Sequence, residues 1–183
     1  MPANQFKYLL HGIFITLLLL MTPRLNGQVF FYTNVIADID KQVEKINDRK
    51  GNNGIRIAPW DSIQNFYDFN GPNIFGHFHF NVLEKAMIKI EEESGTQWTT
   101  TYYFKDNKLI HVEITCFRIA GFSGPTWYEL AGKYRYWFDH DAFISSDITL
   151  IPPDSPYQVS FTSAELLDQA TCFADLLYKE QEK

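Results

Sequence analysis

WTTTYYFKDNKLIHVEITCF, residues 98–117, is the segment from which the fold of this chain can be worked out. Two runs rich in aromatic and β-branched residues, 98–104 and 109–117, flank a polar tetrapeptide, residues 105–108 (KDNK). Aromatic and β-branched side chains fit a pleated strand, and Asp and Asn tolerate the backbone conformations of turns. The segment therefore predicts a β-hairpin.

The second run of this hairpin alternates with a period of two, so it assigns its side chains to two faces. The face predicted for the core carries Ile110, Val112, Ile114 and Cys116. The face predicted for water carries Leu109, His111, Glu113 and Thr115.

The hairpin pattern recurs further along the chain. Residues 102–110, YYFKDNKLI, match residues 136–144, YWFDHDAFI, in their aromatic, turn and apolar positions. A weaker similarity indicates a third hairpin: Phe80 and Ile90 are separated by the same ten-residue interval as the Phe and the Ile of the other two. The similarity reflects either duplication or the shared demands of hairpins, and both explanations predict an antiparallel meander.

Residues 82–94 have two readings. Asn81 and Glu84 are suited to the start of a helix closed by Gly95, whereas the alternation of residues 86–91 fits a strand that turns into Trp98. The repeat favours the strand. Residues 75–80 form the preceding strand in this prediction, with Phe78 and Phe80 directed inward.

Amphipathic helices are predicted near both ends of the chain. Residues 35–49 carry apolar side chains at helical spacing, and a capping box of Thr162 and Glu165 starts a second helix that reaches Tyr178. We expect an α+β fold: a meander of about five or six antiparallel strands, with both helices packed on one face of the sheet.

The first 27 residues resemble a secretory signal peptide. Lys7 precedes a short apolar run, residues 13–21, and the segment 23–27 then breaks it before a small residue. The apolar run is short for a transmembrane span of about 20 residues, and an uncleaved membrane anchor is the alternative to a cleaved signal. We expect a signal peptide at 1–27, a single domain at 28–183, an exported location (periplasmic or extracellular), and no stable membrane insertion after cleavage.

The charge balance excludes nucleic acid as the expected partner. The chain has 16 Lys and Arg against 22 Asp and Glu, and loss of Lys7 and Arg24 with the signal would leave 14 against 22, a net charge of −8. Nucleic-acid binding requires the opposite sign. Cys116 and Cys172 either form a disulfide or remain buried thiols, and the sequence leaves both open.

Three histidines are candidate metal ligands. His77 and His79 are two residues apart on a predicted strand, so both imidazoles can point the same way, and His111 is a third ligand from a neighbouring strand. A site of this kind would make the protein a metal-dependent enzyme. Against that alternative, two solvent-facing histidines on a half-buried strand explain the same pattern.

An excess of aromatic residues, 16% of the chain, suggests a binding surface. Candidate ligand-binding residues in loops are Trp60, Phe122, Trp127 and Tyr128. No G-x-G-x-x-G, Walker or C-x-x-C motif occurs, so we expect no cofactor. The leading hypothesis is a non-catalytic binding module for a protein, peptide or carbohydrate; a structural component of the cell envelope is a further possibility.

Overall fold

The computed structural model describes residues 32–49, 53–57, 73–92, 94–120, 127–151 and 159–181. The chain divides into two compact units, Met1–Asp40 and Lys41–Lys183. The predicted signal peptide lies outside the described residues. In the first unit, the described residues 32–40 are helical, and the helix extends to residue 48.

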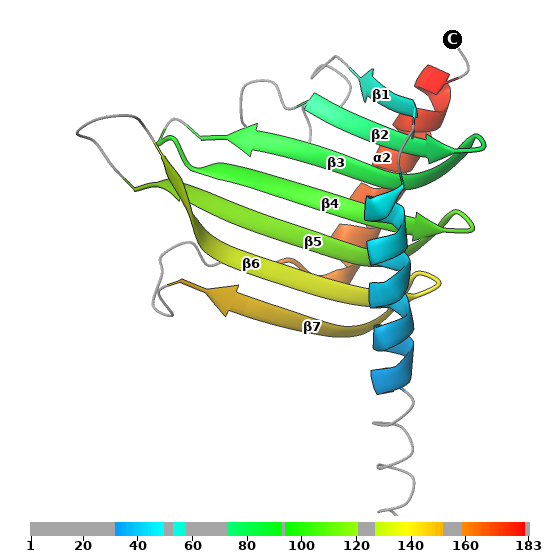
Figure 1. The fold of residues 1–183 in the computed structure, drawn as a ribbon, viewed down its shortest axis with the longest axis horizontal. Coiled ribbons are helices and arrows are strands. Elements are labelled where there is room, and N and C mark those ends of the chain that lie inside the picture. The colour runs from blue at the N-terminus through cyan, green and yellow to red at the C-terminus, as the bar shows by residue number, and fades with distance from the viewer. Residues whose placement is uncertain are drawn as a thin grey trace, which may run out of the picture. The chain divides into compact units, whose positions relative to one another are not determined.

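The second unit contains a seven-stranded antiparallel sheet whose strands follow one another in chain order (Figure 1). The strands are β1 (Asn53–Ile57), β2 (Asn73–His79), β3 (Val82–Glu91), β4 (Gln97–Lys105), β5 (Lys108–Ile119), β6 (Tyr128–Asp139) and β7 (Ala142–Leu150). The predicted α+β class and antiparallel meander are confirmed, and residues 82–91 are strand. β1 is a short edge strand of five residues, so the sheet has one strand more than the upper number expected.

Helix α2 (Ser163–Gln181) packs against one face of this sheet (Figure 1). Its predicted capping box is present: the Glu165 amide donates to Thr162 Oγ1 at 3.2 Å, and the Thr162 amide donates to Glu165 Oε2 at 2.7 Å. The fully buried side chains between helix and sheet include Leu83, Ile88, Tyr102, Val112, Ile114, Tyr134, Phe138, Leu166, Phe173 and Leu177. This layer is the hydrophobic core.

Polar contacts fix α2 over the sheet. The Tyr102 hydroxyl donates to Gln169 Oε1 at 2.7 Å, and the Tyr102 ring lies 5.7 Å from that of Phe173. Near the other end of the helix, the Leu83 amide donates to the Tyr178 hydroxyl at 2.9 Å. A Cβ at Gly76 would come within 2.6 Å of Leu177 Cδ2, so a glycine there lets α2 approach β2 closely.

Three hairpins, β2–β3, β4–β5 and β6–β7, share one construction. Each turn has two residues with positive φ, in order Phe80 and Asn81, Asp106 and Asn107, and His140 and Asp141. Two such residues make the turn that matches the twist of the flanking strands. In each hairpin a bulge also shifts the pairing register by one residue. On the first strand the shift falls just before the second residue ahead of the turn, which is Phe78, Phe104 or Phe138. The predicted repeat is therefore real as a structural unit and includes the third hairpin.

This shared construction corrects two predicted orientations. Phe80 is a turn residue, 89% exposed, and does not point inward. The structural equivalent of Phe104 and Phe138 is Phe78, which is buried. Leu109 is buried rather than exposed to water, because the bulge at Ile110 reverses the alternation expected from the sequence. His111, also predicted to face water, is only 2% exposed, because the rings of Tyr103 and Trp137 flank it.

The end of the N-terminal helix that belongs to the second unit contacts the sheet on the side opposite α2. Asn47 Nδ2 donates to the Tyr103 hydroxyl at 3.3 Å, and Arg49 pairs with Glu84. Tyr103 follows Tyr102, which faces α2, so the two side chains lie on opposite faces. The prediction that both helices pack on one face is thus wrong for this part of the chain.

The packing of α2 makes a prediction about stability. Phe173→Ala should lower the free energy of unfolding by about 3–5 kcal/mol, since it empties space in a fully buried layer. Thr171→Ala, at an exposed position of the same helix, is the matched control and should change it by less than about 0.5 kcal/mol. Urea denaturation measures both. Equal losses would contradict the placement of α2.

Candidate functional site

The sheet face opposite α2 is polar over its central strands. Strand pairing places four side chains of β4 to β7 in each of two neighbouring rows that cross the strands. The first row is Thr99, Thr115, Lys133 and Thr149, and the second is Thr101, Glu113, Arg135 and Asp147. We call these eight residues the polar face. It lies on the side of Tyr103, where α2 does not reach.

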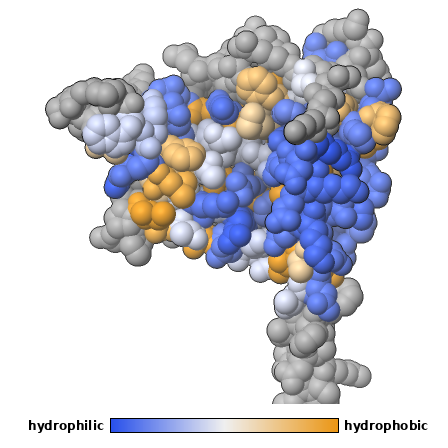
Figure 2. Space-filling view, in the orientation of Figure 1, coloured by the Kyte–Doolittle hydropathy of each residue, from blue (hydrophilic) through white to orange (hydrophobic). Residues whose placement is uncertain are grey.

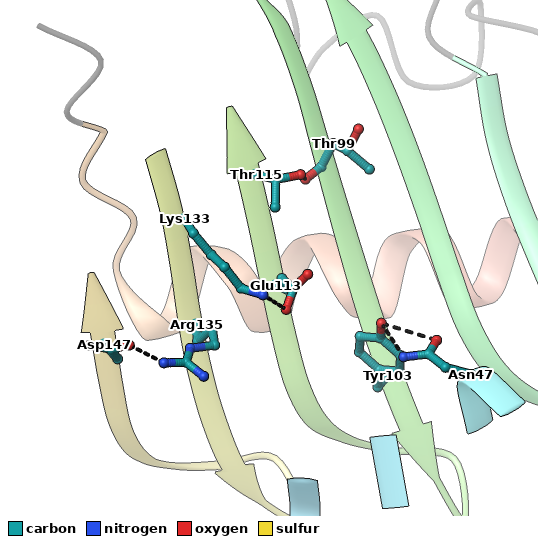
Figure 3. Close-up of polar contacts among 8 residues, drawn as sticks. All are labelled: Asn47, Thr99, Tyr103, Glu113, Thr115, Lys133, Arg135 and Asp147. Atoms are coloured by element: carbon teal, nitrogen blue, oxygen red, sulfur yellow. Dashed lines mark hydrogen bonds and ion pairs between the residues drawn. The ribbon is translucent and has the colours of Figure 1, made fainter. Parts of the chain in front are cut away.

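The charges of the polar face are paired (Figure 3). Lys133 Nζ lies 2.8 Å from Glu113 Oε2, and Arg135 forms an ion pair with Asp147. All four side chains are between 30% and 44% exposed. Exposed ion pairs contribute about 0–1 kcal/mol to stability, so the fold does not depend on them. They present alternating charges whose sum is zero.

An aromatic row, formed by Tyr103, His111 and Trp137, borders the polar face. The ring centroids of His111 lie 5.7 Å from Tyr103 and 5.4 Å from Trp137. The Arg135 guanidinium carbon lies 5.3 Å from the centroid of the Trp137 ring, and its buried Nε has no hydrogen-bond partner in the described part of the chain. Burial raises the pKa of Tyr103, an effect that the Asn47 hydrogen bond opposes and the nearby Glu113 charge reinforces.

The opposite border of the polar face is apolar. Phe117 and Ile119 continue the alternation of Glu113 and Thr115 along β5, and Ile119 pairs with Tyr128. Tyr128 is 40% exposed and the adjacent Trp127 is 53% exposed. Figure 2 shows hydrophilic side chains grouped over the centre of the sheet with hydrophobic groups beside them. Of the predicted ligand-binding residues, Trp127 and Tyr128 therefore lie near this surface, whereas Trp60 and Phe122 lie outside the described residues.

The three predicted metal ligands are not brought together. His77 and His111 lie on the same row but on β2 and β5, three strand spacings or about 14 Å apart. The ring of His79 contacts that of Phe80 in a tilted arrangement with centroids 4.3 Å apart, and His111 is 2% exposed within the aromatic row. Among the described residues no group of three or more His, Cys, Asp or Glu is placed to hold a metal ion.

The two thiols are not arranged for nucleophilic chemistry. Cys116 and Cys172 are free in the structure. Burial, reinforced by the charge of Glu92, raises the pKa of the Cys116 thiol to about 11. Burial and Asp175 also raise the pKa of Cys172. Because the thiolate is the reactive form, neither side chain is activated.

The charged members of the polar face, apart from Glu113, were not singled out by sequence reasoning. Lys133 and Arg135 are two residues apart, which is a visible signal for one strand face. Their partners, however, come from the two neighbouring strands, 20 residues earlier for Glu113 and 12 later for Asp147. Only the strand register shows that these charges meet.

Comparisons with models of protein families, with characterised proteins and with solved structures found no match to this chain. Within the described parts of the chain, neither helix has both the length and the apolar character needed to cross a membrane.

The surroundings of His77 make stability depend on pH. Burial and the positive charge of Lys85 lower its pKa, so the folded state binds this proton less readily than the unfolded state. Stability should be fully present above the unfolded value of about 6.5 and should fall as the pH decreases below it.

His77→Gln should remove the pH-dependent contribution of this side chain to stability. The loss of unfolding free energy between about pH 7.5 and about pH 5.5, measured with urea, should be smaller in the variant than in the parent chain. Thr171→Ala, an exposed position of α2 whose side chain does not titrate, is the control and should leave the loss unchanged. An equal pH dependence in all three proteins would disprove the assignment.

Proposed function

We propose that this protein is a non-catalytic binding module that holds a partner protein on the polar face and its apolar border. The observation that carries the proposal is the arrangement of Glu113, Lys133, Arg135 and Asp147 as two cross-strand ion pairs on a sheet face that α2 leaves open. Charges that contribute little to folding remain able to select a partner.

The composition of this surface supports a protein rather than a small molecule. Protein interfaces combine an apolar part with aromatic residues and Arg and a polar part with hydrogen-bonding groups. Tyr128 and Trp127 supply the first, and the threonine hydroxyls with the ion pairs supply the second. Small ligands favour concave sites. Two clefts of about 320 and 330 Å³ occur at the hairpin tips, and neither is lined by the polar face.

The charges of the polar face favour selective binding of one partner but do not strongly attract charged molecules from a distance. Its two positive and two negative charges cancel, whereas the chain as a whole carries a net charge of −6. Matched alternating charges favour a partner with the reverse pattern and disfavour one with a single sign. This arrangement fits recognition of one protein surface better than attraction to a polyanion.

We also propose that the protein is exported, because residues 1–27 resemble a signal peptide. Expression of the full chain in its source cells should give a protein that starts at Gln28, and intact mass spectrometry of the purified product checks this. The physical reason is the charged start followed by a short apolar run. A product that retains residues 1–27 would contradict the signal-peptide part of the proposal and leave the binding part intact.

Photo-cross-linking tests the binding surface. A benzophenone side chain placed at Thr101 or Thr115 should form a discrete cross-linked product in the source cells. The same group at Asp175, which is exposed on α2, should not. Thr101 and Thr115 are partly exposed on the polar face and are not core residues.

The charge pattern supplies a second variant. Lys133→Glu together with Arg135→Glu should reduce the cross-linked product by about tenfold, because two attractive contacts become repulsive. Circular dichroism should show an unchanged fold. Products of equal yield from Thr115 and Asp175, or a product insensitive to the double substitution, would overturn the proposal.

A further inference from the structure

Phe80 departs from the rule that the other two hairpins follow. The first residue of the two-residue turn is Asp106 in β4–β5 and His140 in β6–β7, both polar, but it is Phe80 in β2–β3. All three have similar φ values, 49° for Phe80, 52° for Asp106 and 49° for His140. The other two hairpins thus show that a polar residue is sufficient at this turn position.

Two costs accompany Phe80. A positive φ is strained for a bulky side chain, whereas Asp and Asn adopt it readily. Phe80 is also 89% exposed, and the tilted contact with the His79 ring at 4.3 Å covers only part of its ring. Residues held in strained conformations cluster at functional sites. A strained and exposed aromatic side chain, at a position where polar residues suffice, indicates a binding role.

Phe80 lies at the edge of a cleft of about 330 Å³ in the second unit. Ile46 and Val82 add apolar side chains to this cleft, and Glu84, Arg49 and Lys105 add charges. Val82 is 40% exposed. The volume is at the lower limit of ligand sites, so the cleft accommodates a side chain rather than a large cofactor.

Glu84 gives the cleft a preference for an N–H donor. Its Oε1 pairs with Arg49, whereas its Oε2 is buried and has no hydrogen-bond partner in the part of the chain that the structure describes. A buried carboxylate oxygen without a donor is unfavourable, so a donor that reaches it gains binding energy. The net charge of −6 further favours a cationic donor.

We propose that the cleft beside Phe80 binds a peptide segment in which an apolar side chain is followed by a basic residue. The apolar side chain packs against Phe80, Val82 and Ile46. The basic residue donates to Glu84 Oε2, which a rotation of the partly exposed Glu84 side chain brings to the cleft. This site is separate from the polar face and does not depend on the function proposed for it.

Titration with defined peptides tests the proposal. The probes are the acetylated and amidated hexapeptides GSLKSG, GSLESG and GSGKSG, added to isotope-labelled full-length protein. We expect GSLKSG to shift the amide NMR signals of Phe80, Val82 and Glu84. GSLESG and GSGKSG should bind at least about tenfold more weakly, because each lacks one of the two elements. No shift with GSLKSG, or equal affinity for the three peptides, would overturn the proposal.

Variants separate binding from folding. Phe80→Asn should weaken GSLKSG binding by about tenfold while the melting temperature stays equal or rises, since Asn suits the turn better than Phe. His140→Asn, at the equivalent turn position outside the cleft, should leave the affinity unchanged. Glu84→Gln should abolish the preference for GSLKSG over GSLESG. Unchanged GSLKSG binding in Phe80→Asn would show that Phe80 has no binding role.

Discussion

The structure depends on one local constraint, the pair of left-handed turn residues that closes each of the three similar hairpins. A two-residue turn with positive φ at both positions fixes which residues face each other across the strands, and the bulge that follows it fixes which faces they occupy. A slip of one residue would move the core side chains of β5 to the opposite face. Because the same device recurs at β2–β3, β4–β5 and β6–β7, the faces of all six strands are set consistently.

The separation of functions between the two faces follows from this register. Tyr102, Val112 and Ile114 reach α2 and form the core, while their neighbours Tyr103, Glu113 and Thr115 point the other way. α2 in turn ties the hairpins together. Tyr178 accepts the Leu83 amide at the first hairpin and donates to Asn107 Oδ1 at 2.6 Å at the second. The face that packs against α2 therefore stabilises the fold, whereas the other face carries side chains whose ion pairs contribute little to stability.

Much of this architecture could be predicted because it is encoded locally. The turn residues, the alternating strands and the capping box of Thr162 and Glu165 each occupy a few consecutive positions. The orientations of Leu109 and Phe80 could not be predicted. At Leu109 a bulge reverses the period-two pattern and leaves no clear sequence signal, and Phe80 lies in the turn although its aromatic side chain is typical of a strand. The polar face was missed for a different reason: Arg135 and Asp147 become neighbours only through strand pairing. Strand order likewise explains why the three histidines are not brought together, because His77 lies on β2 and His111 on β5.

The first hairpin can carry a strained turn because contacts with α2 hold both of its strands. Phe78 packs edge-on against Tyr178 at 5.4 Å, the Leu83 amide donates to the same hydroxyl, and Gly76 admits Leu177 against the strand. These contacts lie on both sides of the Phe80–Asn81 turn. Strain persists only where the surrounding structure overdetermines the conformation, and here two buried anchors and one hydrogen bond do so. A turn residue at this tip can therefore be selected for what it contacts outside the fold, whereas the tips of the other two hairpins retain residues selected for the turn itself.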